Sequence, residues 1–423
     1  MEKYSSIYKE KESEVRSYCR KFPVEFSKAL NSELFTRGGE RYIDFFNMAG
    51  SLNYGHNNPY IKNAILDYLS EDNIINALDL YTEAKADFLT TFTERILKPR
   101  HLDYKVMCCG PTGTNAIEAA LKLARKNKRR TNVFAFSGAF HGMTLGSLAL
   151  TTDQVSRNGA GTPLNNVTFV PYENNRINSI AYIQHILEDD HSGVALPAAI
   201  FVETTQAEGG VNVASEEWLK ELRNICDEYD ILLVVDDIQV GSGRTGWFFS
   251  FERAGIVPDM VVLSKSISGF GMPMSLLLMK PELDIFLPAE HNGTFRGNQL
   301  SFVGAKAGIE YFISHHIDEE VRRKAAIIDE FIKEHILPLD ARLSHRGIGM
   351  IWGIDFMRIE AEKALACCHE CFERSLVIEL AGRHDSVLKL MPALTIEDTV
   401  LLEGLNIIKE SVATVLYREL TIS

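Results

Sequence analysis

The sequence lacks the features of a membrane or secreted protein. No apolar run approaches the roughly 20 residues of a membrane-spanning helix. The densest runs, 231–235 and 275–279, have only the length of a strand. The first residues are charged and polar, which does not match a signal or transit peptide. We therefore expect a cytoplasmic protein that does not act at a membrane.

Cysteine is scarce, with seven in 423 residues. An odd number in a chain long enough for a large core does not indicate a disulfide framework. Cys367, Cys368, His369 and Cys371 stand close together, but their stretch has helical periodicity and no second ligand pair follows at zinc-finger spacing. We therefore expect these cysteines to be core residues of a helix, and we expect no metal site.

Basic residues are also fewer than acidic residues. The chain has 44 Lys and Arg against 57 Asp and Glu, a formal net charge of −13. Such an acidic protein has no global field that attracts nucleic acid or an anionic membrane, so we expect neither as a partner, although one cleft can still hold a local cationic pocket. A composition of 46% hydrophobic and 24% charged residues is typical of an ordered globular chain.

Between residues 105 and 279, short apolar runs alternate with helical stretches. The runs are at 106–109, 131–136, 198–203, 231–236, 260–263 and 274–279. This pattern predicts an α/β fold with a mostly parallel sheet covered by helices on both faces. The flanking segments, including an amphipathic helix at about 10–21, predict a small α+β domain formed by both ends of the chain. We place the N-terminal part of the small domain at 1–75, the large domain at 76–310 and the C-terminal part at 311–423.

A glycine-rich turn at 110–115 (GPTGTN) lies between a predicted strand and a predicted helix. Free N–H groups and the positive end of a helix dipole suit a phosphate monoester. N-capping by Thr112, Thr114 or Asn115 explains the same residues. A second glycine-rich segment, 241–246 (GSGRTG), has the residue spacing of a dinucleotide-binding fingerprint. It lacks the structural context of that fingerprint, because no helix is predicted to begin there.

Two predicted strands end in charged side chains. Asp236 and Asp237 follow one of them, and only one of the two can face a given pocket because successive strand residues point to opposite sides. Lys265 follows another, and burial would lower its pKa and make it an amine nucleophile. An exposed acidic turn and a lysine that reaches solvent are the alternatives. Phe140 is either a stacking ring or a core residue.

Together these features meet the four needs of pyridoxal phosphate. Its aldehyde requires an amine, its pyridine nitrogen an anion, its phosphate hydrogen-bond donors and its ring a stacking partner. Lys265, Asp236, the turn at 110–115 and Phe140 supply these groups.

From about Phe22 to its C-terminus the sequence resembles the class III aminotransferases of fold type I. The resemblance rests on 236–246 (DDIQVGSGRTG) with Ser264-Lys265, and on 51–59 (SLNYGHNNP), 110–116 (GPTGTNA), 140–146 (FHGMTLG), 159–167 (GAGTPLNNV) and 293–298 (GTFRGN). It implies a mostly parallel seven-stranded sheet between helices, a small α+β domain, and pyridoxal phosphate as the cofactor. It also implies a homodimer with shared active sites, or a larger assembly of such dimers.

The resemblance further implies roles for single residues. Lys265 bonds to the cofactor and moves the substrate proton, Asp236 pairs with the pyridine nitrogen, and Gln239 bonds the ring hydroxyl. The other cofactor-binding residues that it implies are Thr112, Gly113, Thr114, Phe140, His141 and Glu203, with Thr294 reaching the neighbouring subunit's phosphate. The implied substrate-binding residues are Asn53, Tyr54, Glu208 and Lys389.

Two positions depart from the ornithine and acetylornithine transaminases of the same class. Those enzymes resemble one another in carrying arginine where this chain has Met143 and Lys389. Lysine cannot form the planar two-point clamp of arginine, so we expect a different recognition of substrate carboxylates.

The segments most resemble those class members that transfer the amino group of L-glutamate to L-aspartate 4-semialdehyde, giving 2,4-diaminobutyrate and 2-oxoglutarate. That product serves the synthesis of a compatible solute such as ectoine, of siderophores or of peptide antibiotics. A 4-aminobutyrate or ornithine type of ω-amino acid transaminase, a glutamate-semialdehyde aminomutase and a non-catalytic binding module remain alternatives. The joint presence of Lys265, Asp236 and Gln239 disfavours the last.

Overall fold

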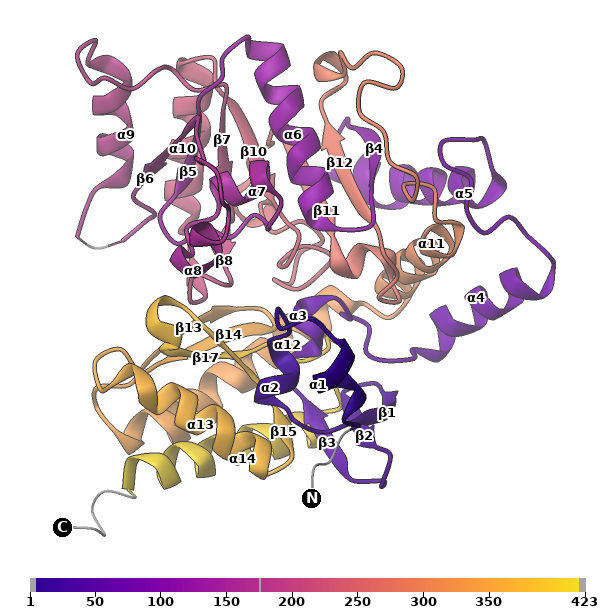
Figure 1. Ribbon diagram of the computed structural model, residues 1–423, viewed down its shortest axis with the longest axis vertical. Helices are drawn as coiled ribbons and strands as arrows, with labels where there is room; N and C mark the ends of the chain where they lie inside the picture. The colour runs from indigo at the N-terminus through magenta and orange to yellow at the C-terminus, as the bar shows by residue number, and fades with distance from the viewer. Residues whose placement is uncertain (1–4, 175, 418–423) are drawn as a thin grey trace.

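The computed structural model describes residues 5–174 and 176–417. Its centre is a seven-stranded sheet in the order β4-β12-β11-β10-β7-β5-β6 (Figure 1). The strands are β4 (Lys105–Gly110), β12 (Ser275–Met279), β11 (Met260–Ser264), β10 (Leu232–Asp236), β7 (Ala199–Val202), β5 (Val133–Phe136) and β6 (Val167–Val170). Only β12 runs antiparallel to its neighbours. The mostly parallel sheet predicted from the sequence is therefore confirmed.

The side chains of the central strands alternate between two apolar cores. Phe134 and Phe136 of β5 pack in one core with α9 and α10, whereas Val133 and Ala135 pack in the other with α6. This alternation follows from the two-residue period of a strand, and it explains why a sheet covered on both faces reads as a continuous apolar run. The helices of this part are α5 (Glu83–Phe92), α6 (Gly113–Lys128), α7 (Leu145–Leu150), α8 (Gln154–Asn158), α9 (Ser179–Glu188), α10 (Glu216–Glu228) and α11 (Gln299–Ser314).

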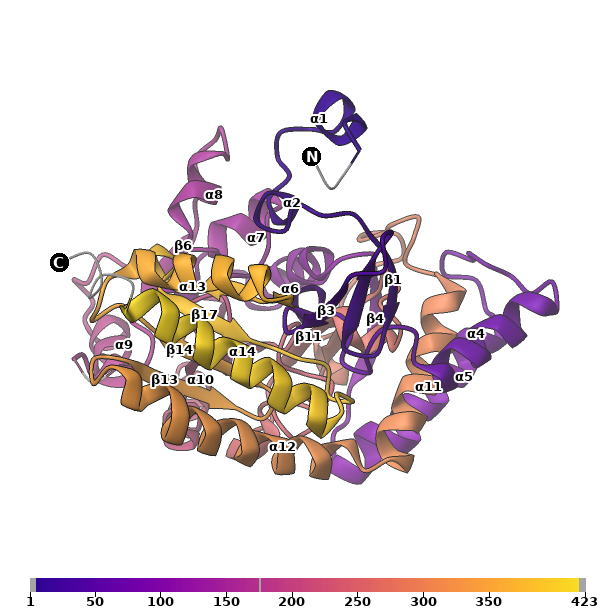
Figure 2. The same ribbon diagram turned by 90° about the horizontal axis from the view of Figure 1, so that it is seen from below.

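Two smaller sheets lie below the large one in Figure 1. One has the order β1-β2-β3-β15 and joins the two ends of the chain, because β15 pairs with β3. The other has the order β13-β14-β17-β16, and α12, α13 and α14 lie along it (Figure 2). The strands are β1 (Phe26–Leu30), β2 (Glu33–Thr36), β3 (Arg41–Asp44), β13 (Ser344–Ile348), β14 (Ile351–Asp355), β15 (Leu376–Val377), β16 (Glu379–Ala381) and β17 (Val387–Leu390). The domain boundaries that we placed after residues 75 and 310 remain predictions.

The remaining elements are short or flank these sheets. They are α3 (Asn47–Gly50), α4 (Pro59–Ser70), α12 (Ile317–Phe331), α13 (Ala361–Glu373), α14 (Asp398–Tyr417) and the hairpin of β8 (Thr205–Gln206) with β9 (Asn212–Val213). Cys367, Cys368 and Cys371 are buried core residues of α13, as predicted. Among the described helices, none has both the length and the apolarity to cross a bilayer.

Two local predictions were wrong. The helix expected at about 10–21 is instead two short helices, α1 (Ile7–Lys11) and α2 (Tyr18–Lys21), neither of which buries a residue. Without an apolar face against a core, a longer helix gains no tertiary support. Strand β6 was missed because it is a half-buried edge strand and has no long apolar run.

Candidate active site

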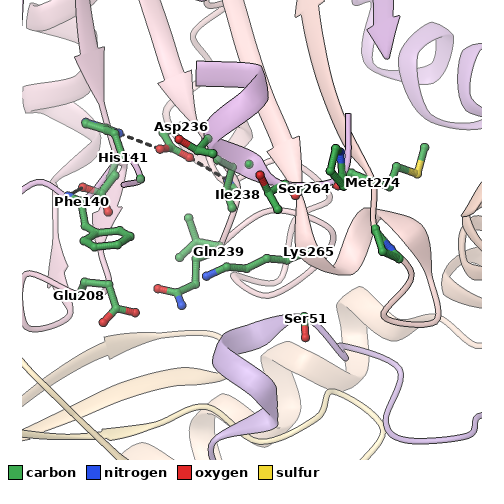
Figure 3. A pocket seen from close by; sticks show the side chains of 18 of the residues that line it. Ser51, Phe140, His141, Glu208, Asp236, Ile238, Gln239, Ser264, Lys265 and Met274 are labelled. Carbon is green, nitrogen blue, oxygen red and sulfur yellow. Dashed lines mark hydrogen bonds and ion pairs between the residues drawn. The ribbon is translucent and has the colours of Figure 1, made fainter. Parts of the chain in front are cut away.

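A cavity of about 460 Å³ lies at the carboxyl ends of β10 and β11 (Figure 3). These strands are parallel neighbours, with Asp236 opposite Val262, so Asp236 and Lys265 leave the sheet side by side. Carboxyl ends of parallel strands are where α/β sheets bind their ligands. Many of the residues expected at the site line this cavity, namely Thr112, Gly113, Thr114, Phe140, His141, Glu203, Glu208, Asp236, Gln239 and Lys265.

Lys265 begins the turn that follows β11, and its side chain reaches into the cavity toward Gln239 (Figure 3). Its backbone has a φ of +52°, in the left-handed region that is rare for non-glycine residues and often occurs at functional sites. Burial lowers the pKa of Lys265, and the nearby charge of Lys389 acts in the same direction, although Glu208 opposes both. The site therefore favours a neutral, nucleophilic amine.

Asp236 is a buried carboxylate held by two donors. His141 Nδ1 lies 2.7 Å from one of its oxygens, and the backbone N–H of Ile238 donates to the other over 3.1 Å. Burial alone would lower the pKa of His141, but the hydrogen bond and charge of Asp236 raise it overall. The pair thus presents an oriented anion at the end of β10, as a protonated pyridine nitrogen requires.

Phe140 lies beside the cavity with its ring turned toward it (Figure 3). Its backbone N–H donates to Glu203 over 3.0 Å, and burial raises the pKa of Glu203 to about 8. Ile238 also lines the cavity. Phe140 is therefore placed at the cavity, and its role as a stacking ring remains a prediction.

The glycine-rich turn forms the N-terminus of α6, which begins at Gly113. Asn115 accepts a hydrogen bond from the backbone of Thr112 over 3.2 Å, so part of the capping interpretation holds. A Cβ atom on Gly113 would lie 2.6 Å from Ile238, and one on Gly142 would lie 2.7 Å from the Thr114 hydroxyl. A side chain at either position would therefore collide with residues that line the cavity beside the N-terminus of α6.

One wall of the cavity has an ion pair between Glu208 and Lys389. Glu208 lines the cavity and accepts a hydrogen bond from Lys389 Nζ over 2.6 Å. Lys389 itself lies behind the cavity wall and is fully buried. Gln239 donates to the carbonyl oxygen of Ala49 over 2.9 Å, which fixes its amide at the cavity edge.

Besides Lys389, three expected residues do not line this cavity. Asn53 is buried and accepts a hydrogen bond from Arg244 over 2.6 Å, so its amide is occupied inside the protein. Tyr54 is buried against Tyr311. Thr294 lies on an exposed loop, where its carbonyl oxygen accepts from Asn76. Sequence similarity marks these residues without showing which of them face the site.

The structure also adds residues that the sequence did not single out. Ser51 lines the cavity and belongs to the matched segment 51–59, which is the signal that could have found it. Glu379 lies 3.0 Å from Lys389, and Tyr18 donates to Glu379 over 3.0 Å. No sequence pattern marks these two, because they meet only through strand pairing and the path of the N-terminal segment.

Comparison with known proteins agrees with this arrangement. The model of the family "Aminotransferase class-III" matches residues 16–412. A diaminobutyrate–2-oxoglutarate transaminase of Bordetella parapertussis is 51% identical over 98% of this chain and 96% of its own length. One of Wolinella succinogenes is 50% identical over 97% and 96%.

Solved structures share the fold at low sequence identity. The ornithine aminotransferase of Toxoplasma gondii superposes with a TM-score of 0.85 at 22% identity, covering 97% of this chain and 94% of that one. The acetylornithine aminotransferase of Elizabethkingia anophelis has a TM-score of 0.80 at 24% identity, covering 96% and 97%. With the family model spanning nearly all of its length, the chain belongs to the class III aminotransferases.

Proposed function

We propose that this aminotransferase transfers the amino group of L-glutamate to L-aspartate 4-semialdehyde, giving L-2,4-diaminobutyrate and 2-oxoglutarate. The observation that carries the proposal is near-full-length identity of about half to relatives named for this activity. The described cavity supports it, because the amine, the anion, the helix terminus and the aromatic ring that the chemistry needs all meet there.

Pyridoxal phosphate is the cofactor of this family, and when bound it supplies an aldehyde that carries amino groups and a ring that withdraws electrons. In our proposal Lys265 holds the aldehyde end, the turn from Thr112 to Thr114 the phosphate, and Phe140 one ring face. Asp236 holds the ring nitrogen and Gln239 the ring hydroxyl. The glycine contacts described above fit such a group.

The residues of the chain then have distinct tasks. The neutral amine of Lys265 accepts the proton from the reacting carbon of glutamate and returns a proton during amination of the second substrate. Asp236, oriented by His141, keeps a negative charge at the far end of the cavity. Lys265 therefore acts as the general base, and Asp236 provides electrostatic stabilisation.

The two substrates differ beside the reacting carbon, where glutamate has a carboxylate and aspartate 4-semialdehyde has none. A site that accepts both substrates needs a cation that is available to the carboxylate of glutamate and is neutralised by the protein when the semialdehyde binds. Lys389 is such a cation, and Glu208 neutralises it over 2.6 Å. Met143, which is 54% exposed, offers no charge for this purpose. We therefore assign the carboxylate beside the reacting carbon to Lys389.

We also propose a cytoplasmic homodimer. Thr294 lies outside its own cavity, on a loop with the exposed side chain of Phe295. Asn76 contacts this loop, and the exposed Leu78 and Leu80 follow Asn76 in the chain. Burial of such apolar side chains favours association, which would carry Thr294 to a second copy's site. The described cysteines are all free, as is usual in a reducing compartment.

The proposal is tested by turnover of the purified, cofactor-loaded protein with a panel of substrates. We expect glutamate with aspartate 4-semialdehyde to give the highest kcat/KM, and ornithine and 4-aminobutyrate to be at least about tenfold poorer as amino donors. A preference for 4-aminobutyrate or ornithine would assign the protein to another type of ω-amino acid transaminase.

A further inference from the structure

Lys389 is held by two carboxylates rather than one. Its Nζ atom lies 2.6 Å from Glu208 and 3.0 Å from Glu379, and none of its side chain is exposed. A buried ammonium group needs partners, and here Glu208 accepts its hydrogen bond while Glu379 forms a second ion pair with it. Burial alone would lower the pKa of Lys389, but these two charges raise it, so the side chain remains a cation.

The two acids differ in their freedom to move. Glu208 is 28% exposed, and it lines both the cofactor cavity and an adjoining pocket next to Arg383. Glu379 is only 5% exposed and stands directly opposite Lys389 in the pairing of β16 with β17. Strand pairing therefore fixes Glu379 beside the lysine, while Glu208 has open space into which it can turn.

Tyr18 fixes the second carboxylate further. Its hydroxyl donates to Glu379 Oε1 over 3.0 Å, and its ring packs 4.8 Å from that of Phe46, measured between ring centres. Tyr18 is 45% exposed, and its partial burial together with the charge of Glu379 raises its pKa, so the phenol keeps its proton and remains a donor. Burial and the charge of Glu208 raise the pKa of Glu379, whereas Lys389 and the Tyr18 hydroxyl act in the opposite direction and favour the ionised carboxylate.

We propose that Glu379 and Tyr18 are positioning residues that hold Lys389 in place while Glu208 is exchanged for the carboxylate of a dicarboxylate substrate. This inference rests on the proposed function in assigning a substrate carboxylate to Lys389. Lys389 then always has two anionic partners: Glu379, which is fixed, and either Glu208 or the substrate carboxylate. The exchange therefore leaves the local charge unchanged. The N-terminal segment at α2 thereby affects substrate choice, although it does not line the cofactor cavity.

The consequence of losing the fixed anion follows from charge balance. Without an ionised Glu379, Glu208 becomes the only counter-charge of Lys389 and is harder to displace. Dicarboxylates should then bind more weakly. Diaminobutyrate has no carboxylate beside its reacting carbon, so it needs no such displacement and should be little affected.

The test uses the cofactor-loaded protein with Tyr18→Phe and Glu379→Gln. Their controls are Tyr182→Phe and Glu362→Gln, at exposed positions of α9 and α13. Binding of glutarate, a non-reacting dicarboxylate, is measured by calorimetry, and KM is measured for 2-oxoglutarate and for diaminobutyrate. A thermal unfolding scan checks that each variant folds.

We expect the glutarate Kd and the 2-oxoglutarate KM to rise about threefold for Tyr18→Phe and about tenfold for Glu379→Gln, with the diaminobutyrate KM within twofold of the parent. Equal changes for both substrates would mean a general structural role and would overturn the inference, as would glutarate binding no weaker than in the controls. A Lys389→Met variant that binds glutarate normally would also overturn it. If the protein fails the substrate panel above, the proposed function falls, but glutarate binding by the variants still decides the role of Tyr18 and Glu379.

Discussion

His141 Nδ1 lies 2.7 Å from a carboxylate oxygen of Asp236, and both side chains are buried. The contact joins the loop after β5 to the end of β10, two strands that β7 separates in the sheet, and the two segments together present one oriented anion. Because both side chains are buried, water screens that charge little and it acts strongly at short range.

Replacing Asp236 by Asn should lower kcat by at least about 100-fold, because a neutral amide no longer stabilises positive charge at the far end of the cavity. His141→Gln keeps a donor and should cost only about tenfold. Steady-state kinetics at saturating cofactor separates the two. Similar losses in both variants would mean that the contact, and not the charge of Asp236, is what matters.

Lys265→Met should abolish turnover, with a loss of at least about 100-fold, because it removes both the amine nucleophile and the general base. The cofactor-free protein should become more stable at neutral pH. Burial lowers the pKa of Lys265, so the unfolded chain binds a proton that the folded protein resists, and the lysine destabilises the fold below its ordinary pKa. Urea unfolding at pH 7 measures this; an equally or less stable variant would contradict it.

Gly142→Ala should weaken cofactor binding by about tenfold or more, since the added methyl group meets Thr114 in the phosphate turn at 2.7 Å. Gly161→Ala is the matched control, because that residue also has a positive φ but has open space around it. Titration of each variant with pyridoxal phosphate, followed by absorbance, gives the affinities. Equal weakening in both would trace the effect to backbone strain alone.

Glu203→Gln should change how stability depends on pH. The pKa of Glu203 is about 8 in the fold and 4.5 in the unfolded chain. Between these values the folded protein holds a proton that the unfolded chain has released, so stability falls as pH rises. In the cofactor-free protein the variant should be more stable at pH 8.5, on the order of 4 kcal/mol, with a much smaller difference at pH 5.

Urea unfolding at both pH values provides the measurement for Glu203→Gln. Glu282→Gln, at an exposed position, should show no such pH dependence. A difference between Glu203→Gln and its parent that is the same at pH 5 and pH 8.5 would argue against a protonated Glu203.

Much of this site could be predicted because its groups follow single strands. Asp236 and Lys265 each end a long apolar run, and parallel pairing of β10 with β11 places them together without further information. The turn at 110–115 is similarly local, since a glycine-rich sequence before a helix is visible in the chain itself. Sequence position and strand direction were enough for these groups.

The environment of Lys389 could not be predicted in the same way. Its partner Glu379 depends on how β16 turns back onto β17 through Gly382, His384 and Asp385, all of which have positive φ. Tyr18 reaches Glu379 from a distance of 361 residues along the chain. Such contacts arise from tertiary packing, and one sequence has no periodic pattern that marks them.

The most direct test of the proposed activity follows the nitrogen atom itself. The cofactor-loaded protein is incubated with 2-oxoglutarate and with 2,4-diaminobutyrate carrying ¹⁵N only at the nitrogen of carbon 4, and the products are analysed by mass spectrometry. We expect the label to appear in glutamate, with aspartate 4-semialdehyde as the other product. Unlabelled glutamate would show that the amino group on carbon 2 is transferred, and absence of glutamate would show that diaminobutyrate is not a substrate; either result would contradict the proposal.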